Sequence, residues 1–358
     1  MGDWAPRWMS DRELGLAERH PPGGLPGPQP AGRSAPDRNL GLELVRATEA
    51  AALAAARLMG RGDPEAVDRA AVDAMRLMLG TVPMDGLVVI GRGEKDDTPT
   101  LYSGEAIGKA GAPAVDIAVL PIDGVRLTAQ GMNGALSVAA LVERGSLLEP
   151  GPCAYMDKIA VGQEAADAID IEAPVADNLR RIAAATGSQV ADLTVMILDR
   201  NRHERLVGDV RDAGARIRFL LDGDVAGAIA AARRGTGVDL LMGIGGTAEG
   251  IIAACALKCL GGAIQGRLAP RDEAERERTA GAGYDADRVL ATDDLVSGDD
   301  VFFAATGITD GDLLGGVRYR GDSAITHSIA MRSRSGTVRL IDAEHHRDKL
   351  KRFSAIEY

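Results

Sequence analysis

The sequence predicts a layered α/β protein in which helices cover β-sheets, and three features of the 358-residue chain lead to this prediction. Two amphipathic helical patterns occupy residues 40–60 and 65–82. Short runs rich in Val, Ile and Ala follow them and predict several strands. From residue 193 onward strand and helix patterns alternate, which is typical of a mainly parallel sheet covered by helices.

The helices expected in the first half have recognisable ends. The pattern over 40–60 carries apolar residues at helical spacing and stops at Gly60, and Gly62-Asp63-Pro64 opens the second helix. The expected strands share a composition rich in small and branched apolar residues: part of 84–94, then 114–124, then 134–145.

The second half is expected to alternate. Its elements follow in this order: a capped helix in 173–187, a strand at 193–199, a helix and a strand in 209–224, a helix in 224–237, a strand, glycine loop and helix in 238–262, a charged and solvated helix in 267–289, and strands with tight turns in 300–346.

The overall composition excludes several classes of protein. Hydrophobic residues make up 46% and charged residues 26% of the chain, which is typical of a soluble globular protein. A formal charge of −11 argues against nucleic acid or an anionic membrane as the main partner. The chain shows neither an apolar stretch of membrane-spanning length nor a signal-peptide pattern, so we expect a cytoplasmic protein.

The N-terminal region and the cysteine pair each favour an ordinary structural interpretation. Residues 1–37, which contain Trp4 and Trp8, are expected to form a disordered tail, because 20–37 is too rich in Pro and Gly for a regular element. Cys255 and Cys259 lie four residues apart in an Ala- and Leu-rich segment, and buried hydrophobic roles in a reducing compartment are favoured over a metal pair.

Three loops at predicted strand ends are candidates for a ligand site, since open α/β sheets bind ligands there. They comprise 222–224, the glycine-rich 243–250 and the polar 91–97. The N–H groups of 243–250 could hold an anion at a helix start, although a tight structural turn fits this loop equally well. The cationic candidates, each of which alone also fits a solvated surface charge, are Lys158, Arg200 and Arg202.

A series of motifs resembles a known family. The segments are RATEAAALAAARLMGRGD, VDRAAVDAMRLML, DGLVVIGRGE, AVDIAVLPIDGVRLTAQG, YMDKIAVG, ADNLRRIAAATG, DGDVA, GIGGTAEG and FAATGITDGDLLGGV. In this order they resemble class II fructose-1,6-bisphosphatase, of the metal-dependent, lithium-sensitive sugar-phosphatase superfamily, over residues 39–340. The resemblance implies a layered αβαβα fold with two sheet-containing subdomains, 38–172 with the metal loops and 173–358 with the substrate-phosphate loops.

The resemblance also implies hydrolysis of a sugar (bis)phosphate with Mg²⁺ or Mn²⁺, in which metal-activated water attacks the phosphorus. Of the family's five metal-binding carboxylates this chain keeps Asp68, Asp123 and Glu249. Arg92 and Leu120 replace the other two, and Val125 replaces the threonine that orients the attacking water. We therefore expect a degenerate metal site that binds a cation weakly, or none.

The substrate side of the family pattern is better kept, although Arg-Asn-Arg replaces Lys-Pro-Arg at 200–202. The expected substrate-binding residues are Arg92, Asp123, Tyr155, Arg200, Asn201, Arg202, Asp222, Gly223, Asp224 and Gly246. The expected catalytic acids are Asp96 and Asp123, and Glu94 and Asp96 are further acids that could restore the metal site. His203 and His327 fit packing or surface roles better than catalysis.

Three functions are consistent with these substitutions. The first is a weakened phosphatase with a reduced, single-metal site. The second is a non-hydrolytic sugar-phosphate binder or regulator, in which Arg92 replaces the metal and holds phosphate bidentately with help from Arg200, Arg202 and Lys158. The third is a different reaction on a phosphorylated sugar, with proton transfer by Asp96, Asp123 or Glu249. In each case the partner is a small sugar phosphate, and we expect a homo-oligomer.

Overall fold

The computed structural model describes residues 39–92, 100–346 and 348–350. The chain divides into two compact units, Met1–Asn39 and Leu40–Tyr358, and the fold below is that of the second unit. The expected tail with Trp4 and Trp8, the expected catalytic Asp96, and Glu94 lie outside the described residues.

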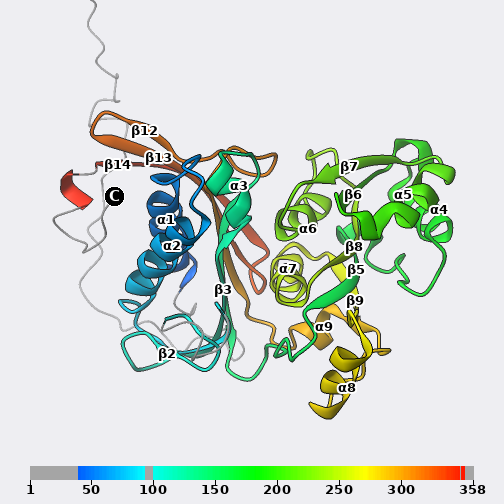
Figure 1. Ribbon diagram of the computed structural model, residues 1–358, viewed down its shortest axis with the longest axis horizontal. Coiled ribbons are helices and arrows are strands. Elements are labelled where there is room, and N and C mark those ends of the chain that lie inside the picture. The colour runs from blue at the N-terminus through cyan, green and yellow to red at the C-terminus, as the bar shows by residue number, and fades with distance from the viewer. Residues whose placement is uncertain (1–38, 93–99, 347, 351–358) are drawn as a thin grey trace, which may run out of the picture. The chain divides into compact units, whose positions relative to one another are not determined.

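The second unit is built of five layers, as Figure 1 shows. Helices α1 (Gly41–Ala56) and α2 (Pro64–Leu79) cover the outer face of an eight-stranded sheet. Helices α6 (Val225–Ala232) and α7 (Thr247–Leu260) pack between this sheet and a six-stranded sheet. The fifth layer consists of α4 (Val175–Thr186) and α5 (Glu204–Asp212). The predicted αβαβα architecture is confirmed.

The eight-stranded sheet joins strands from both ends of the unit. Its order is β12-β13-β11-β4-β3-β1-β2, with β14 paired to β13, and only β1 and β3 run parallel. The strands are β1 (Asp85–Ile90), β2 (Ala106–Ile107), β3 (Ala114–Asp123), β4 (Leu136–Glu143), β11 (Phe302–Gly307), β12 (Arg318–Arg320), β13 (Ser323–Arg332) and β14 (Thr337–His346).

The six-stranded sheet has the order β10-β9-β5-β8-β6-β7. Its strands are β5 (Tyr155–Val161), β6 (Thr194–Leu198), β7 (Arg216–Leu220), β8 (Leu240–Gly246), β9 (Ala263–Leu268) and β10 (Leu290–Ala291). Only β6–β7 and β6–β8 run parallel, so the prediction of a mainly parallel sheet was wrong. The reason is that β5 and β9, which the strand patterns did not predict, pair antiparallel with their neighbours.

The sheets do not separate along the chain at the expected boundary of 172/173. Strand β5 precedes this boundary yet belongs to the six-stranded sheet, and β11 to β14 follow it yet belong to the eight-stranded sheet. The remaining helices are α3 (Val125–Gln130), α8 (Glu273–Gly281) and α9 (Thr292–Leu295). Helix α8 is shorter than the charged helix expected in 267–289, and its Glu275 and Thr279 are buried.

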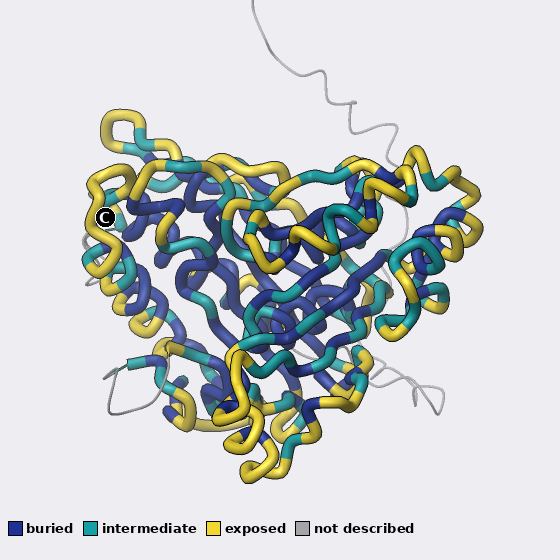
Figure 2. Tube along the Cα trace, turned by 45° about the vertical axis from the view of Figure 1, so that its right-hand side comes forward, coloured by how far each residue is buried: buried dark blue, intermediate teal, exposed yellow. Residues whose placement is uncertain are grey.

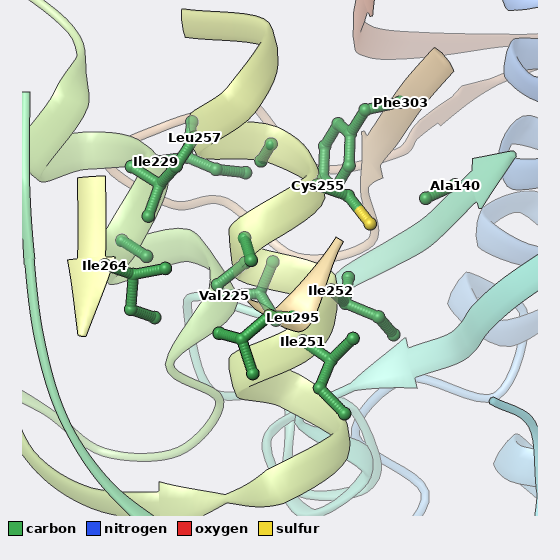
Figure 3. Close-up of a cluster of buried hydrophobic side chains, with 14 of the residues drawn as sticks. Ala140, Val225, Ile229, Ile251, Ile252, Cys255, Leu257, Ile264, Leu295 and Phe303 are labelled. Carbon is green, nitrogen blue, oxygen red and sulfur yellow. The ribbon is translucent and has the colours of Figure 1, made fainter. Parts of the chain in front are cut away.

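Alternate side chains of the strands enter different cores, as the pleat of a β-strand requires. In β3, Ile117 and Val119 pack toward α1 and α2, whereas Ala118 packs toward α7. Helix α7 is almost wholly buried, and Figure 3 shows its Ile251, Ile252, Cys255 and Leu257 among side chains of the layers around it. Figure 2 shows the buried residues of this unit inside and the exposed ones along its outer loops.

The cysteines fit the buried hydrophobic role that was expected of them. Cys255 and Cys259 are buried in α7, and burial raises the pKa of the Cys255 thiol to about 12, so this thiol keeps its proton. Among the residues that the structure describes, none of the helices combines the length and the apolar character that a membrane span requires.

A buried polar cluster links α1 to β13 and β14. The Thr326 hydroxyl donates to Glu49 Oε1 at 3.0 Å and lies 2.8 Å from His345 Nε2. Burial raises the pKa of Glu49 to about 7 from an ordinary 4.5, although the Thr326 hydrogen bond lowers it in part. Glu49 therefore keeps its proton in the folded protein over a pH range in which the unfolded chain has already lost it.

This difference predicts how stability depends on pH. The stability that protonated Glu49 contributes is present below pH 4.5 and is lost as pH rises toward 7. We expect Glu49→Gln to be more stable than the wild type by about 3 kcal/mol at pH 8 but only about 1 kcal/mol at pH 5. Urea unfolding at both pH values measures this, with Glu65→Gln on the exposed face of α2 as control. An equal difference at both pH values would contradict the assignment.

Candidate functional site

A cavity of about 610 Å³ lies where strand ends of the two sheets meet. It brings together most of the residues that the sequence singled out: Asp68, Arg92, Leu120, Asp123, Val125, Tyr155, Arg200, Arg202, Asp222, Gly223, Asp224, Gly246 and Glu249. Asn201 is exposed and does not line the cavity. The functional roles expected of all these residues stay predictions.

Local structure explains how two of the acids reach this cavity. The Asp63 side chain accepts a hydrogen bond from the Ala66 N–H at 2.9 Å and Pro64 opens α2, so the helix begins at a fixed residue and carries Asp68. Strand β3 ends at Asp123, and Gly124, with φ of 96°, turns the chain into α3.

Arg92 is bound to one of the retained acids. Its Nε donates to Asp68 Oδ2 at 2.9 Å, and a terminal guanidinium nitrogen donates to the same oxygen. A metal ion at Asp68 would have to displace or repel this guanidinium, since both need the same carboxylate. Asp68 is thus neutralised by Arg92, which stands where the family resemblance implies a metal-binding glutamate.

Lys158 is not a surface cation but a buried one. Its Nζ lies 2.6 Å from Asp224 Oδ2 and donates to the Gly246 carbonyl at 2.9 Å, and the side chain is 1% exposed. A buried ammonium needs such partners, and an anionic ligand could reach it only by breaking the pair. Lys158 therefore joins β5 to the loops before α6 and α7.

Two arginines hold the 221–222 loop. Arg200 donates to Asp222 Oδ1 at 2.7 Å and to the Leu221 carbonyl at 2.8 Å. Arg126, which the sequence analysis did not single out, donates to the same carbonyl at 3.0 Å and lies 3.6 Å from Asp222 Oδ2. The sequence feature that could have indicated Arg126 is its position, three residues after Asp123. Asp222 is thus paired on both sides.

Arg202 has no carboxylate partner among the described residues. It donates to the Ile244 carbonyl, with Nε at 3.2 Å, and its guanidinium lies 5.0 Å from the centre of the Tyr155 ring. Arg202 and Tyr155 both line the cavity. Of the cations expected to bind phosphate, Arg202 is the one whose charge is not already neutralised by a described carboxylate.

Both histidines have structural partners. His203 is buried, with Nδ1 2.7 Å from the Leu198 carbonyl, and its Nε2 accepts from the Ile244 N–H at 2.8 Å. This neutral tautomer joins the ends of β6 and β8. His327 Nδ1 lies 2.6 Å from Asp342 Oδ1 across the β13–β14 pair. The packing role expected for His203 fits these contacts.

Asp123 and Glu249 are the cavity acids without a bound cation among the described side chains. Burial raises the pKa of Asp123 well above its usual range, and the Glu249 and Asp224 carboxylates raise it further. Burial also raises the pKa of Glu249, as does Asp224. Asp123 Oδ2 is buried without a hydrogen-bond partner in the described chain. The Lys158 ammonium lowers both pKa values only in part.

The contacts of the cavity carboxylates limit how a divalent metal ion could bind. No group of three or more His, Cys, Asp or Glu side chains in the described ranges is arranged to hold a metal ion. The five-carboxylate cage of the family does not fit, because Asp68 is ion-paired and Leu120 is apolar. Asp123 and Glu249 line the cavity without a basic partner among the described side chains, and Mg²⁺ is often held by one or two carboxylates together with substrate phosphates.

Comparisons with known proteins agree with the motifs. The family of bacterial fructose-1,6-bisphosphatases, glpX-encoded, matches residues 38–345. A "D-fructose 1,6-bisphosphatase class 2/sedoheptulose 1,7-bisphosphatase" of Synechococcus sp. (strain JA-2-3B'a(2-13)) is 42% identical over 337 residues, 87% of this chain and 97% of the relative. A "Fructose-1,6-bisphosphatase class 2" of Haemophilus influenzae is 44% identical over 327 residues, 88% and 98% of the two chains.

Close approach of the 222–224 loop to Asp123 generates a prediction. A Cβ at Gly223 would lie 2.5 Å from Asp123 Oδ1, and Gly223 also has φ of +65°. Gly235 has φ of +85° but nothing within 4 Å of such a Cβ. We expect Gly235→Ala to lose about 1–2 kcal/mol from its backbone alone. Gly223→Ala should lose this same backbone contribution and about 1–3 kcal/mol more from the clash with Asp123. Urea unfolding compares them, and equal losses would contradict the packing described.

Proposed function

Because this chain belongs to the glpX-encoded family of bacterial fructose-1,6-bisphosphatases, we propose that it binds a sugar bisphosphate in the cavity and hydrolyses it slowly, using a single divalent cation. The ion pair between Arg92 and Asp68 is the observation that carries this proposal. It removes a third carboxylate from a site in which two others have already been replaced.

The charges of the cavity favour a phosphatase over a cation-free binder. Three of the four cations expected to hold phosphate are already paired with a carboxylate: Arg92 with Asp68, Arg200 with Asp222, and Lys158 with Asp224. Arg202 alone cannot balance the charge of two phosphate groups. A divalent cation supplies the missing positive charge.

Asp123 and Glu249 are the residues that would hold this cation, with an oxygen of the bound phosphate as a further ligand. Such a cation neutralises charge on the phosphoryl oxygens and lowers the pKa of a bound water. Asp123 and Glu249 must first release their protons. Arg202 and Tyr155, which also line the cavity, would bind and orient the phosphorylated sugar.

We expect slow hydrolysis because the cavity lacks two groups that would assist the reaction. Val125 has no hydroxyl that could orient the attacking water, and Leu120 offers no carboxylate. The substrate class we propose is a ketose bisphosphate, the kind of compound named in the descriptions of both relatives.

A second candidate is a sugar-phosphate binder without hydrolysis, and Val125, which offers no hydroxyl to orient a water, favours it. The two candidates differ in one measurable respect. The phosphatase requires a cation for activity and gains affinity from it, whereas the binder holds bisphosphate equally well in the presence of a chelator.

Reversion of the two replaced acids tests the proposal. We expect Arg92→Glu combined with Leu120→Asp to raise phosphate release from fructose 1,6-bisphosphate with Mn²⁺ by tenfold or more, about 1.4 kcal/mol in activation free energy. The exposed Arg205, changed to Glu, controls for the added negative charge. Low, Mn²⁺-dependent release by the wild type is also expected. Wild-type release as fast as that of the reverted protein would contradict the weakened site.

The raised pKa values of Asp123 and Glu249 predict the pH dependence of cation binding. Because both acids lose protons when a cation binds, Mn²⁺ affinity in the presence of fructose 1,6-bisphosphate should increase as pH rises. Calorimetry in two buffers of different ionisation enthalpy measures the protons released. Asp123→Asn should reduce that number, and proton release unchanged by this substitution would show that another group binds the cation.

A further inference from the structure

Glu105 is a buried carboxylate that belongs to neither the expected metal site nor the expected substrate site. The residue is 5% exposed. Its Oε1 accepts a hydrogen bond from Arg76 Nε of α2 at 2.8 Å, and its Oε2 accepts one from the Leu101 N–H. A buried carboxylate is costly unless such partners hold it. Glu105 thus joins α2 to the turn at Leu101.

Leu101 has a backbone conformation that few residues adopt. Its φ is +52°, in the left-handed region that is unfavourable for a residue with a Cβ, and its side chain is fully buried. Such a conformation persists only where the surroundings hold it. The hydrogen bond from the Leu101 N–H to Glu105 holds it from one side, and the packing of the Leu101 side chain in the core with α1 and α2 holds it from the other.

The turn at Leu101 also fixes the backbone of Arg92. The Arg92 N–H donates to the Leu101 carbonyl at 2.7 Å. Gly91, directly before Arg92, comes so close to this carbonyl that a Cβ on Gly91 would lie 2.0 Å from its oxygen. Glu105 is tied to the same strand, because its own carbonyl accepts from the Val88 N–H of β1 at 2.9 Å. The end of β1, where Arg92 begins, is therefore held against the turn.

Both ends of this arrangement are anchored on α2. Arg76, which binds Glu105, lies eight residues after Asp68, which binds the Arg92 side chain, and this spacing is about 12 Å along the helix axis. The Arg92 side chain is 44% exposed, and an exposed ion pair alone contributes little. A fixed backbone strengthens the pair, because Arg92 then loses less conformational freedom when it binds Asp68.

We propose that Glu105 is a positioning residue, which fixes the turn at Leu101 so that Arg92 stays bound to Asp68 and keeps a cation away from that carboxylate. The inference deepens the proposed function and rests on its single-cation site. Glu105 is not one of the residues that line the cavity, so it acts on the cation only through Arg92. A change at Glu105 should therefore let Asp68 bind a cation although the cavity keeps all of its own side chains.

The number of Mn²⁺ ions bound per chain tests this role. Electron paramagnetic resonance of free Mn²⁺, with fructose 1,6-bisphosphate present, measures it for each protein with and without Asp68→Asn. The wild type should bind the same number in both forms. Glu105→Gln keeps the size of the side chain but loses the charge that Arg76 binds. It should bind one additional ion, at least tenfold more tightly than the wild type does, and Asp68→Asn should abolish this gain.

A matched buried carboxylate controls for a general loss of stability. Asp116 of β3 is 2% exposed, accepts hydrogen bonds from the Gly145 and Leu147 N–H groups, and lies 3.3 Å from Arg144 Nε. Asp116→Asn should lower the melting temperature without adding a Mn²⁺ ion. An additional Asp68-dependent ion in the Asp116→Asn protein would show that any loosening of the fold releases Asp68, and would overturn the specific role of Glu105.

The dependence on Arg92 is tested in an Arg92→Gln protein, which lacks the guanidinium that Glu105 positions. There Glu105→Gln should change Mn²⁺ affinity less than twofold. An equal gain in both backgrounds, or a folded Glu105→Gln protein without the additional ion, would overturn the proposal. If Glu105→Gln does not fold, Arg76→Gln at the half-exposed end of the pair removes one of the two contacts. It should give a smaller Asp68-dependent gain, about threefold, and no gain would equally reject the role.

Failure of this inference is distinguishable from failure of the proposed function. A wild type that releases no phosphate would contradict the proposed hydrolysis. The comparison of Glu105→Gln with and without Asp68→Asn is a binding measurement and needs no turnover. It therefore decides the role of Glu105 whether or not the wild type is a phosphatase.

Discussion

Charge balance in the cavity is the constraint on which the site depends. Five carboxylates, from Asp68, Asp123, Asp222, Asp224 and Glu249, line one cavity of about 610 Å³. Each needs a cation, a proton or a metal ion, because ionised groups in a poorly solvated place are costly. Three are neutralised by basic side chains from other elements, and burial raises the pKa values of the other two. Because Arg92 pairs with Asp68, the carboxylates without a basic partner among the described side chains are those of Asp123 and Glu249.

Much of the fold was predictable from local patterns. Helices α1 and α2 and strand β3 were found because periodic apolar residues, a capping Asp-Pro pair and a terminal glycine define them within a short stretch. Strand β5 was missed because Asp157 and Lys158 interrupt its apolar pattern. Lys158 is tolerated there only since Asp224, 66 residues later, neutralises it, and a partner so far along the chain leaves no local signal.

In the candidate site too, local motifs could be recognised from the sequence, whereas contacts between residues far apart in the chain could not. The loops carrying Asp123, Gly223 and Glu249 could be identified from their motifs, and the structure brings them into one cavity. The pairing of Arg92 with Asp68 could not, because it joins residues 24 apart in a loop and a helix. Arg92 had been expected to hold phosphate, and the structure gives its guanidinium a carboxylate instead. Residue identity led us to expect an altered metal site, and the geometry shows that Arg92 pairs with Asp68.

Diffraction from crystals grown with Mn²⁺ and fructose 1,6-bisphosphate, recorded for manganese anomalous scattering, tests the central claim most directly. One manganese peak is expected, beside the carboxylates of Asp123 and Glu249, with Arg92 still bound to Asp68. A manganese ion coordinated by the Asp68 carboxylate, with the Arg92 side chain displaced from it, would contradict the account.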